Sequence, residues 1–338
     1  MNRAIILDHD YVVDKYLNVY QVVGGSINEW IIPVIHKYRV SREKVFLGGR
    51  GFGLARLFEK YTPRVASISK KKIFLSFIKA SQPFITPIEI KEYFSPREAV
   101  SRLIRRAGDA LEKKAVELIS MLIDAGISMS ELGVTGSLMM GIHNPSISDI
   151  DLVVYDCRLV DEIKQAGILA PFSNGLRRKW AEQQSRRLGI PISIAERLYN
   201  PCRRALFKGT QVSVIPVFRR PGWLSVPDLS RATYLGDLEA IVKLDINDCN
   251  YMYYPHVFRG EVIASNRKIS EKRNATIVSY ESLYSFISAE TKLAKARGVS
   301  YLLDNTVVIV IGGRETTSYI YPLGLSSGSR IGSRITSS

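Results

Sequence analysis

The sequence has few cysteines and no long apolar run, and each shortage excludes a class of protein. Its 338 residues include three cysteines, Cys157, Cys202 and Cys249, which are odd in number and far apart. They supply neither a CxxC metal-binding pair nor an evident disulfide framework, so we expect a reducing, cytoplasmic setting. No apolar run approaches the roughly 18 residues that cross a bilayer, and residues 1–10 lack the pattern of a secretory signal. We therefore expect no membrane partner.

Negative charge is scarce relative to positive charge. The chain has 47 Lys and Arg against 32 Asp and Glu, a formal net charge of +15. This excess favours a polyanionic partner, because Lys and Arg contacts to phosphates release counterions with little requirement for sequence. The alternative is a surface whose charge serves only solubility. Nucleic acid, and RNA in particular, is therefore the expected partner.

Changes in hydrophobic period divide the chain into four parts. Short runs rich in Ile, Val and Tyr predict a β-rich region over residues 1–94. Helices and strands then alternate over residues 95–231. Residues 232–325 return to short strands and predict a barrel or a sandwich, which either stands alone or completes the central sheet. The tail, residues 326–338, is rich in Ser, Gly and Arg and is expected to be disordered. The expected fold class is α+β.

Helix-boundary signals mark the start of the central part. Ser95, Pro96 and Glu98 have the spacing of a capping box with proline at the first helical position. Apolar residues recur at helical spacing over residues 111–123, and Gly126 stands where a left-handed residue ends a helix.

The most informative segment is residues 132–156, which reads LGVTGSLMMGIHNPSISDIDLVVYD. Gly136 and Ser137 follow an apolar strand and open a short helix, so backbone amides and the Ser137 hydroxyl can meet a triphosphate. Asp149 and Asp151 are two apart on the next strand and therefore project from the same face. Paired carboxylates of this kind hold Mg²⁺ together with substrate phosphate oxygens, and two such ions stabilise an in-line phosphoryl displacement.

This segment resembles the signature of the polymerase-β-like nucleotidyltransferase superfamily. In that signature a Gly-Ser pair at a strand-to-helix turn precedes an Asp-hydrophobic-Asp strand by about a dozen residues. Residues 8–11, 296–298 and 308–312 are less specifically similar to an archaeal group of predicted nucleotidyltransferases. The resemblance implies a nucleotidyltransferase core with β-rich flanks, a nucleoside triphosphate as donor, and Mg²⁺ or Mn²⁺ as cofactor.

Members of this superfamily usually carry a third carboxylate on a later strand. The archaeal CCA-adding enzymes place it in a segment resembling residues 212–217, where this chain has Ser213. A serine hydroxyl neither holds a metal as an anion does nor accepts the proton of an attacking hydroxyl. Glu239 or Asp245 would replace the missing acid if the next predicted strand lies alongside the strand of Asp149.

The leading hypothesis is an enzyme that transfers a nucleoside monophosphate from a triphosphate to a hydroxyl group of RNA. Gly136 and Ser137 would bind the triphosphate, and Asp149 and Asp151 would be catalytic and hold the metal. One alternative is a non-catalytic nucleic-acid-binding protein on the same fold, which Ser213 favours. The other is nucleotidylation of a protein or a small molecule. Smaller superfamily members of that kind usually have an Ala-Arg pair where this chain has two methionines.

Basic residues gather between residues 176 and 220, downstream of the acidic strand. They predict either a nucleic-acid or triphosphate track beside the site or a solvated helix face. The candidate nucleic-acid contacts are Arg177, Arg178, Lys179, Arg186, Arg187, Arg203 and Arg204.

Three further features are less specific. The glycine-rich run over residues 48–53 lacks the spacing of a dinucleotide loop or a P-loop. His143 is a lone loop histidine, for which a structural or solvated role is expected. Four aromatic residues are candidates for stacking on bases or, as is commoner on strands, for packing: Trp180, Tyr251, Tyr253 and Tyr254.

Overall fold

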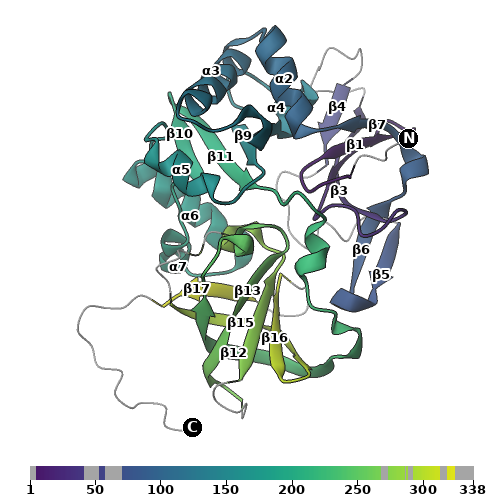
Figure 1. Cartoon of the computed structure of the whole chain (residues 1–338), viewed down its shortest axis with the longest axis vertical. Helices are drawn as coiled ribbons and strands as arrows, with labels where there is room; N and C mark the ends of the chain where they lie inside the picture. The colour runs from purple at the N-terminus through teal and green to yellow at the C-terminus, as the bar shows by residue number, and fades with distance from the viewer. Residues whose placement is uncertain are drawn as a thin grey trace.

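The computed structural model describes residues 5–41, 53–57, 71–267, 273–285, 287, 292–312 and 318–323. Figure 1 shows three parts in chain order: an N-terminal sheet, a central sheet with helices, and a C-terminal barrel. This arrangement confirms the α+β class. The glycine-rich run, apart from Gly53, and the tail over residues 326–338 lie outside the described residues.

The N-terminal sheet is antiparallel throughout and follows the order β5-β6-β3-β2-β1-β7, with β4 paired to β3. All four residues of β1 are buried because both of its faces are covered. Val12 packs inside the sheet, whereas Tyr11 and Val13 join the central core. The strands are β1 (Tyr11–Asp14), β2 (Val19–Val22), β3 (Ile32–Ser41), β4 (Gly53–Arg56), β5 (Lys72–Leu75), β6 (Ala80–Ile85) and β7 (Ile90–Phe94).

The central part is a four-stranded sheet in the order β10-β11-β9-β8. Strand β9 runs antiparallel to β8 and parallel to β11. Its strands are β8 (Leu132–Thr135), β9 (Ile150–Val154), β10 (Arg204–Phe207) and β11 (Thr210–Pro216). Its helices are α2 (Pro96–Arg106), α3 (Ala110–Asp124), α4 (Gly136–Met140), α5 (Leu159–Gln165), α6 (Asn174–Leu188) and α7 (Ile192–Arg197).

The helix-boundary predictions are partly correct. Pro96 is the first residue of α2, and Ser95 precedes it, but the Ser95 side chain makes no capping hydrogen bond. Asp109 instead caps α3 by accepting hydrogen bonds from two backbone amides. Gly126 follows α3 with a φ of +96°, as expected of a residue that ends a helix in the left-handed region.

The C-terminal part is a closed barrel rather than a sandwich. Its sheet follows the order β12-β13-β14-β16-β15-β17, and the additional pairing of β12 with β15 closes five of the strands into a ring. Strand β14 is parallel to β16, and the other pairs are antiparallel. The strands are β12 (Thr233–Asp245), β13 (His256–Ser265), β14 (Asn274–Ser279), β15 (Leu293–Leu303), β16 (Thr306–Ile311) and β17 (Tyr319–Pro322).

The segment between the central sheet and the barrel also contacts the N-terminal sheet. Trp223 is buried, and its indole nitrogen donates to the carbonyl oxygens of Val23 and Gly25 at 3.2 and 3.1 Å. Gly24 has a φ of +69°, and a Cβ atom there would lie 2.8 Å from the indole. Glycine is therefore needed at position 24 for both the backbone angle and the close approach.

A disulfide joins the central part to the barrel. Cys157 and Cys249 are 92 positions apart in sequence, yet their Cα atoms lie 5.7 Å apart and their sulfur atoms are bonded. The sequence analysis found no evident disulfide framework, and on this pair it was wrong because the pairing depends on how two distant loops pack. Cys202 is free. No described helix is both long and apolar enough to cross a bilayer.

Candidate functional site

The turn between β8 and α4 brings the backbone of Gly136 against the carboxylate of Asp151. Gly136 begins α4 with a φ of +70°, and a Cβ atom at this position would lie 2.6 Å from Oδ2 of Asp151. A side chain here would push the carboxylate away, so glycine permits a contact that another residue would block. Ser137 is half-buried and follows directly in the same turn.

Strand register places three polar residues in one row across the sheet. Asp151 pairs with Thr135 of β8 on one side and with Ser213 of β11 on the other. Asp149 directly precedes β9, and both carboxylates are partly exposed, whereas Ile150 and Leu152 are buried. The alternation expected of this strand is therefore confirmed.

Arg204 occupies the side of the row where a third carboxylate was expected. Its guanidinium donates to the Ser213 hydroxyl and lies 3.4 Å from Oδ2 of Asp149. The nearby charge of Asp151, together with burial, raises the pKa of Asp149, and Arg204 opposes that rise. Two neighbouring carboxylates, Asp149 and Asp151, therefore lie beside one guanidinium. We call Asp149, Asp151, Ser213 and Arg204 the acidic row.

The charge of Asp151 also affects two further basic side chains, Lys37 and Arg203. Burial and the neighbouring Arg56 lower the pKa of Lys37, on β3, to about 7, while the charge of Asp151 opposes that shift. Burial, Arg204 and Arg187 lower the pKa of Arg203 to about 9, again against the opposing charge of Asp151. Sequence reasoning missed Lys37, because nothing in its local pattern links it to an acidic strand more than 100 positions away.

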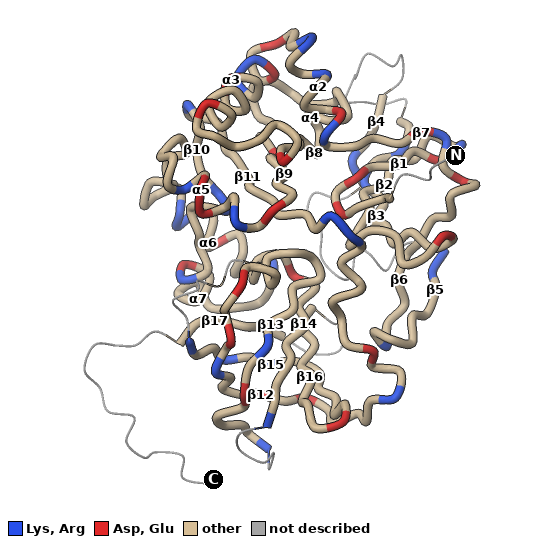
Figure 2. The backbone as a smooth tube through the Cα atoms, in the orientation of Figure 1, with Lys and Arg blue, Asp and Glu red and all other residues tan. Residues whose placement is uncertain are grey.

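The seven basic residues predicted to contact nucleic acid divide into two groups. Arg178, Lys179 and Arg186 are exposed on α6, where Arg178 also pairs with Glu182 at 3.4 Å. The other four are less exposed and bind groups within the protein. Arg177 donates to the backbone carbonyl of Glu196 at 2.8 Å. Arg187 pairs with Glu281 at 3.0 Å, Arg203 donates to the Ser285 hydroxyl, and Arg204 belongs to the acidic row. Lys and Arg occur in all three parts of the molecule, interspersed with Asp and Glu (Figure 2).

The replacement acids proposed from the sequence lie in the barrel. Glu239 is on β12, where it pairs with Lys295 at 2.6 Å and accepts a hydrogen bond from the Tyr319 hydroxyl. Strand β12, which also carries Asp245, pairs with β13 and β15 and not with β9. The condition on which Glu239 or Asp245 would supply the third carboxylate is therefore not met.

The aromatic residues proposed for base stacking mostly fill the interior. Tyr251 and Tyr253 are 6% and 8% exposed, and their rings stack on Phe258 and Phe218. Tyr254 packs edge-on against Trp223, and Trp180 packs edge-on against Tyr199. These contacts favour the packing interpretation.

Two other groups of side chains have spacings suited to a metal ion. Among the described residues, groups of at least three His, Cys, Asp or Glu with this spacing are Asp109, Glu112 and His143, and Asp156, Cys157 and Cys249. The second group offers no thiolate, because its two sulfur atoms are joined in the disulfide. His143 lies 2.7 Å from the carboxylate that caps α3, which agrees with the structural role expected of it. Asp149 and Asp151 belong to neither group.

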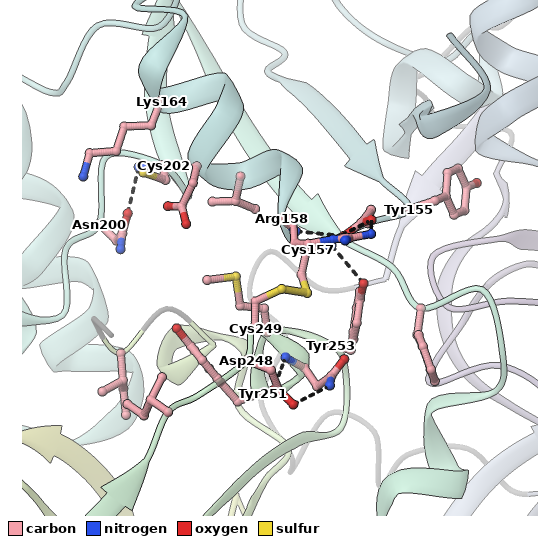
Figure 3. Close-up of a pocket in the computed structure, with 18 of the residues that line it drawn as sticks. Tyr155, Cys157, Arg158, Lys164, Asn200, Cys202, Asp248, Cys249, Tyr251 and Tyr253 are labelled. Atoms are coloured by element: carbon pink, nitrogen blue, oxygen red, sulfur yellow. Dashed lines mark hydrogen bonds and ion pairs between the residues drawn. A yellow bond between two sulfur atoms is a disulfide. The ribbon is translucent and has the colours of Figure 1, made fainter. Parts of the chain in front are cut away.

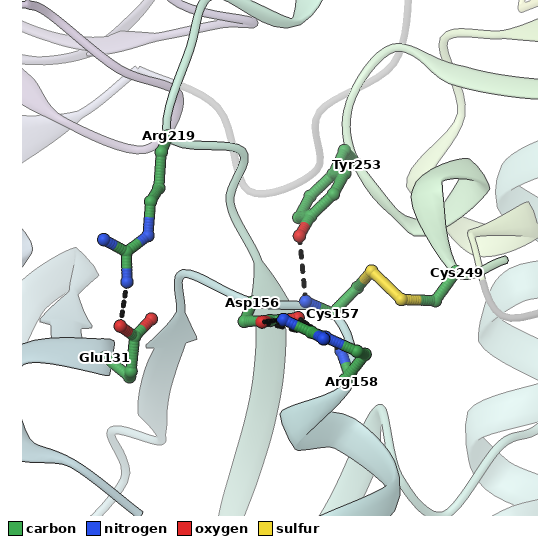
Figure 4. Close-up of polar contacts among 7 residues, drawn as sticks. All are labelled: Glu131, Asp156, Cys157, Arg158, Arg219, Cys249 and Tyr253. Carbon is green, nitrogen blue, oxygen red and sulfur yellow. Dashed lines mark hydrogen bonds and ion pairs between the residues drawn. A yellow bond between two sulfur atoms is a disulfide. The ribbon is translucent and has the colours of Figure 1, made fainter.

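A cavity lies at the C-terminal end of β9, between the central part and the barrel. It has a volume of about 1150 Å³, and the disulfide, Arg158 and Tyr253 lie along its wall (Figure 3). The Cys157 amide donates to the Tyr253 hydroxyl at 2.9 Å, and the nearby Arg158 pairs with Asp156 (Figure 4). The sequence carried no signal for this cavity, because its walls come from segments far apart in the chain.

No family model matches the chain, and neither a curated protein nor a solved structure gives a significant match.

Proposed function

We propose that the protein is a nucleotidyltransferase that uses Mg²⁺ or Mn²⁺ and moves a nucleoside monophosphate from a triphosphate to a hydroxyl group of RNA. The contact between the Gly136 turn and the Asp151 carboxylate is the observation that carries the proposal. A turn of the kind that binds phosphate then lies beside Asp151 on β9, and Asp149 directly precedes that strand. The nucleotidyltransferase core inferred from residues 132–156, and the archaeal kinship inferred from residues 8–11, 296–298 and 308–312, belong to the same proposal.

The donor set suits a divalent cation. The charge of Asp151, together with burial, raises the pKa of Asp149, and a bound cation would offset that repulsion. Oxygen ligands of this kind are the ones that Mg²⁺ prefers, and the bound ion supplies charge neutralisation to the phosphates. Asp149 and Asp151 would hold that ion, and Gly136 and Ser137 would orient the triphosphate.

Basic side chains near the two acids would suit a polyphosphate. Arg204 lies beside Asp149, and the charge of Asp151 acts on both Lys37 and Arg203. Phosphoryl transfer is catalysed chiefly by positioning and by stabilising charge on the phosphate oxygens. RNA is the favoured acceptor because the chain carries a net charge of +15.

The test is incubation of the protein with each α-labelled nucleoside triphosphate, Mg²⁺ and total RNA. Asp149→Asn and Asp151→Asn keep the side-chain size and remove the charge. We expect each to lower label transfer by at least about 100-fold, because metal binding stabilises the transition state by several kcal/mol. Asp124→Asn, at an exposed position in α3, is the matched control and should transfer label normally. Full transfer by either site variant would refute the assignment.

A second function is favoured by one contact. The Arg204 guanidinium on Ser213 puts a fixed cation where superfamily enzymes have an acid. A non-catalytic nucleic-acid-binding protein would show RNA binding that is indifferent to Mg²⁺ and to Asp149→Asn, with no label in any acceptor. Label entering protein or a small molecule instead of RNA would identify the third alternative.

A further inference from the structure

The barrel has the strand order of an OB-fold. Its first three strands, β12, β13 and β14, are neighbours in sequence order, the fifth strand β16 follows, and the fourth, β15, closes the ring against β12. The third and fifth strands are parallel, and the other barrel pairs are antiparallel. OB-folds bind oligonucleotides or oligosaccharides on the face of strands two and three, between the loops that follow strands one and four.

A polar groove lies on that face of this barrel. It has a volume of about 680 Å³. Pairing aligns Lys243, Glu261, Asn274 and Thr306 in one row across four strands. A second row aligns Asp245, Arg259 and Thr276, and Lys292 lies at the margin. The row between them includes the buried Leu244 and Ala275, so the polar rows face outward.

The groove adjoins the cavity of about 1150 Å³ that lies between the barrel and the central part. Ile246 and Asn247, which follow β12, line both hollows. They begin the connection between β12 and β13, which corresponds to the first binding loop of an OB-fold. The Cys157–Cys249 disulfide and the hydrogen bond from the Cys157 amide to Tyr253 hold this connection against the central part. A strand bound in the groove would therefore lead toward the central part.

We infer that this groove binds single-stranded RNA. Lys243, Arg259 and Lys292 supply charge for phosphates, and these three cations outnumber the two acids of the groove, Glu261 opposite Lys243 and Asp245 opposite Arg259. Asn274, Thr276 and Thr306 supply amide and hydroxyl groups for base edges and the 2′-hydroxyl, which a single strand leaves accessible. An oligosaccharide is the other ligand class of the fold, but the net charge of +15 favours a polyanion. The role of this RNA as acceptor rests on the proposed function, whereas its binding does not.

The experiment measures binding of a fluorescent 12-nucleotide single-stranded RNA to the full chain by anisotropy at two salt concentrations. The double variant Lys243→Glu, Arg259→Glu should weaken binding at least about tenfold and reduce its salt dependence. Lys113→Glu reverses an exposed charge on α3, in the upper part of Figure 1, and should bind as the unmodified protein does.

Size-exclusion chromatography and thermal unfolding check that the double variant folds. If the double variant does not fold, Arg259→Ala is used in its place, and we expect it to weaken RNA binding by several fold. Equal binding by the groove variants and the unmodified protein would overturn the inference, as would equal loss in Lys113→Glu. So would binding of a neutral oligosaccharide in place of RNA. RNA binding that depends on the groove, with no label transfer, would retain this inference and refute the proposed transferase.

Discussion

At the scale of single residues, Gly136 begins α4 with a left-handed backbone and has no side chain to displace the nearby carboxylate of Asp151. Gly136 was singled out because it precedes Ser137 at a strand-to-helix turn. The structure adds that its missing side chain leaves room for the Asp151 carboxylate. Asp151 and Gly136 are 15 positions apart, so this contact exists only once β8 and β9 pair.

Gly136→Ala tests this contact. The variant combines the cost of a left-handed alanine, about 1 kcal/mol, with displacement of the Asp151 carboxylate. Gly141→Ala is the matched control, because Gly141 has a φ of +64° with nothing within 4 Å of its would-be Cβ. Both variants should lose similar stability in urea unfolding, and only Gly136→Ala should also lose triphosphate binding in isothermal titration. Equal triphosphate affinity in the two variants would contradict the role given to Gly136.

At the scale of elements, strand pairing decided which residues complete the row. The sequence placed Ser213 on a strand, and the parallel register of β11 with β9 set it beside Asp151. Arg204 entered the same site because β10 is antiparallel to β11 and pairs residue 204 with residue 213. Sequence periodicity predicts that strands exist, but register depends on the partner strand.

Ser213→Asp tests whether the row lacks only an acid. A carboxylate at this position would lie beside Asp151 and within reach of the Arg204 guanidinium. We expect it to lower the Mg²⁺ concentration needed for half-maximal label transfer by roughly tenfold, because an anionic ligand is added. Ser213→Asn has nearly the same shape and no charge, so it should leave the Mg²⁺ dependence unchanged. Identical curves for the two variants would count against a metal at this row.

At the scale of the whole molecule, three parts are joined by contacts between distant segments. Trp223, in the segment between the central sheet and the barrel, binds the N-terminal sheet. Arg187 pairs with Glu281 across the boundary between α6 and the barrel. The Cys157–Cys249 disulfide adds a covalent link between the central part and the barrel. Together these contacts hold the three parts against one another, including the barrel that carries the groove and the central part that carries the acidic row.

Reduction should lower the stability of the whole molecule. A disulfide that closes a loop of 92 positions restricts the unfolded chain, and such links contribute about 2–4 kcal/mol to the free energy of unfolding. We expect Cys249→Ser to lose about that much in urea unfolding without reductant, whereas Cys202→Ser, which removes the free thiol, should not. Adding reductant should bring the unmodified protein to the level of Cys249→Ser. Free thiols at both positions in mass spectrometry of the unreduced protein would contradict the link.

The sequence by itself determined features that depend on neighbouring residues. It predicted the α+β class, the proline start of α2 and the glycine after α3. It also predicted the inward and outward faces of β9, because backbone angles and hydrophobic periods act over a few positions. Only the tertiary structure decided the closure of the barrel, the disulfide, the place of Glu239 in the barrel sheet, and the effect of the Asp151 charge on the pKa of Lys37. These features depend on segments brought together by packing, which local sequence patterns do not encode.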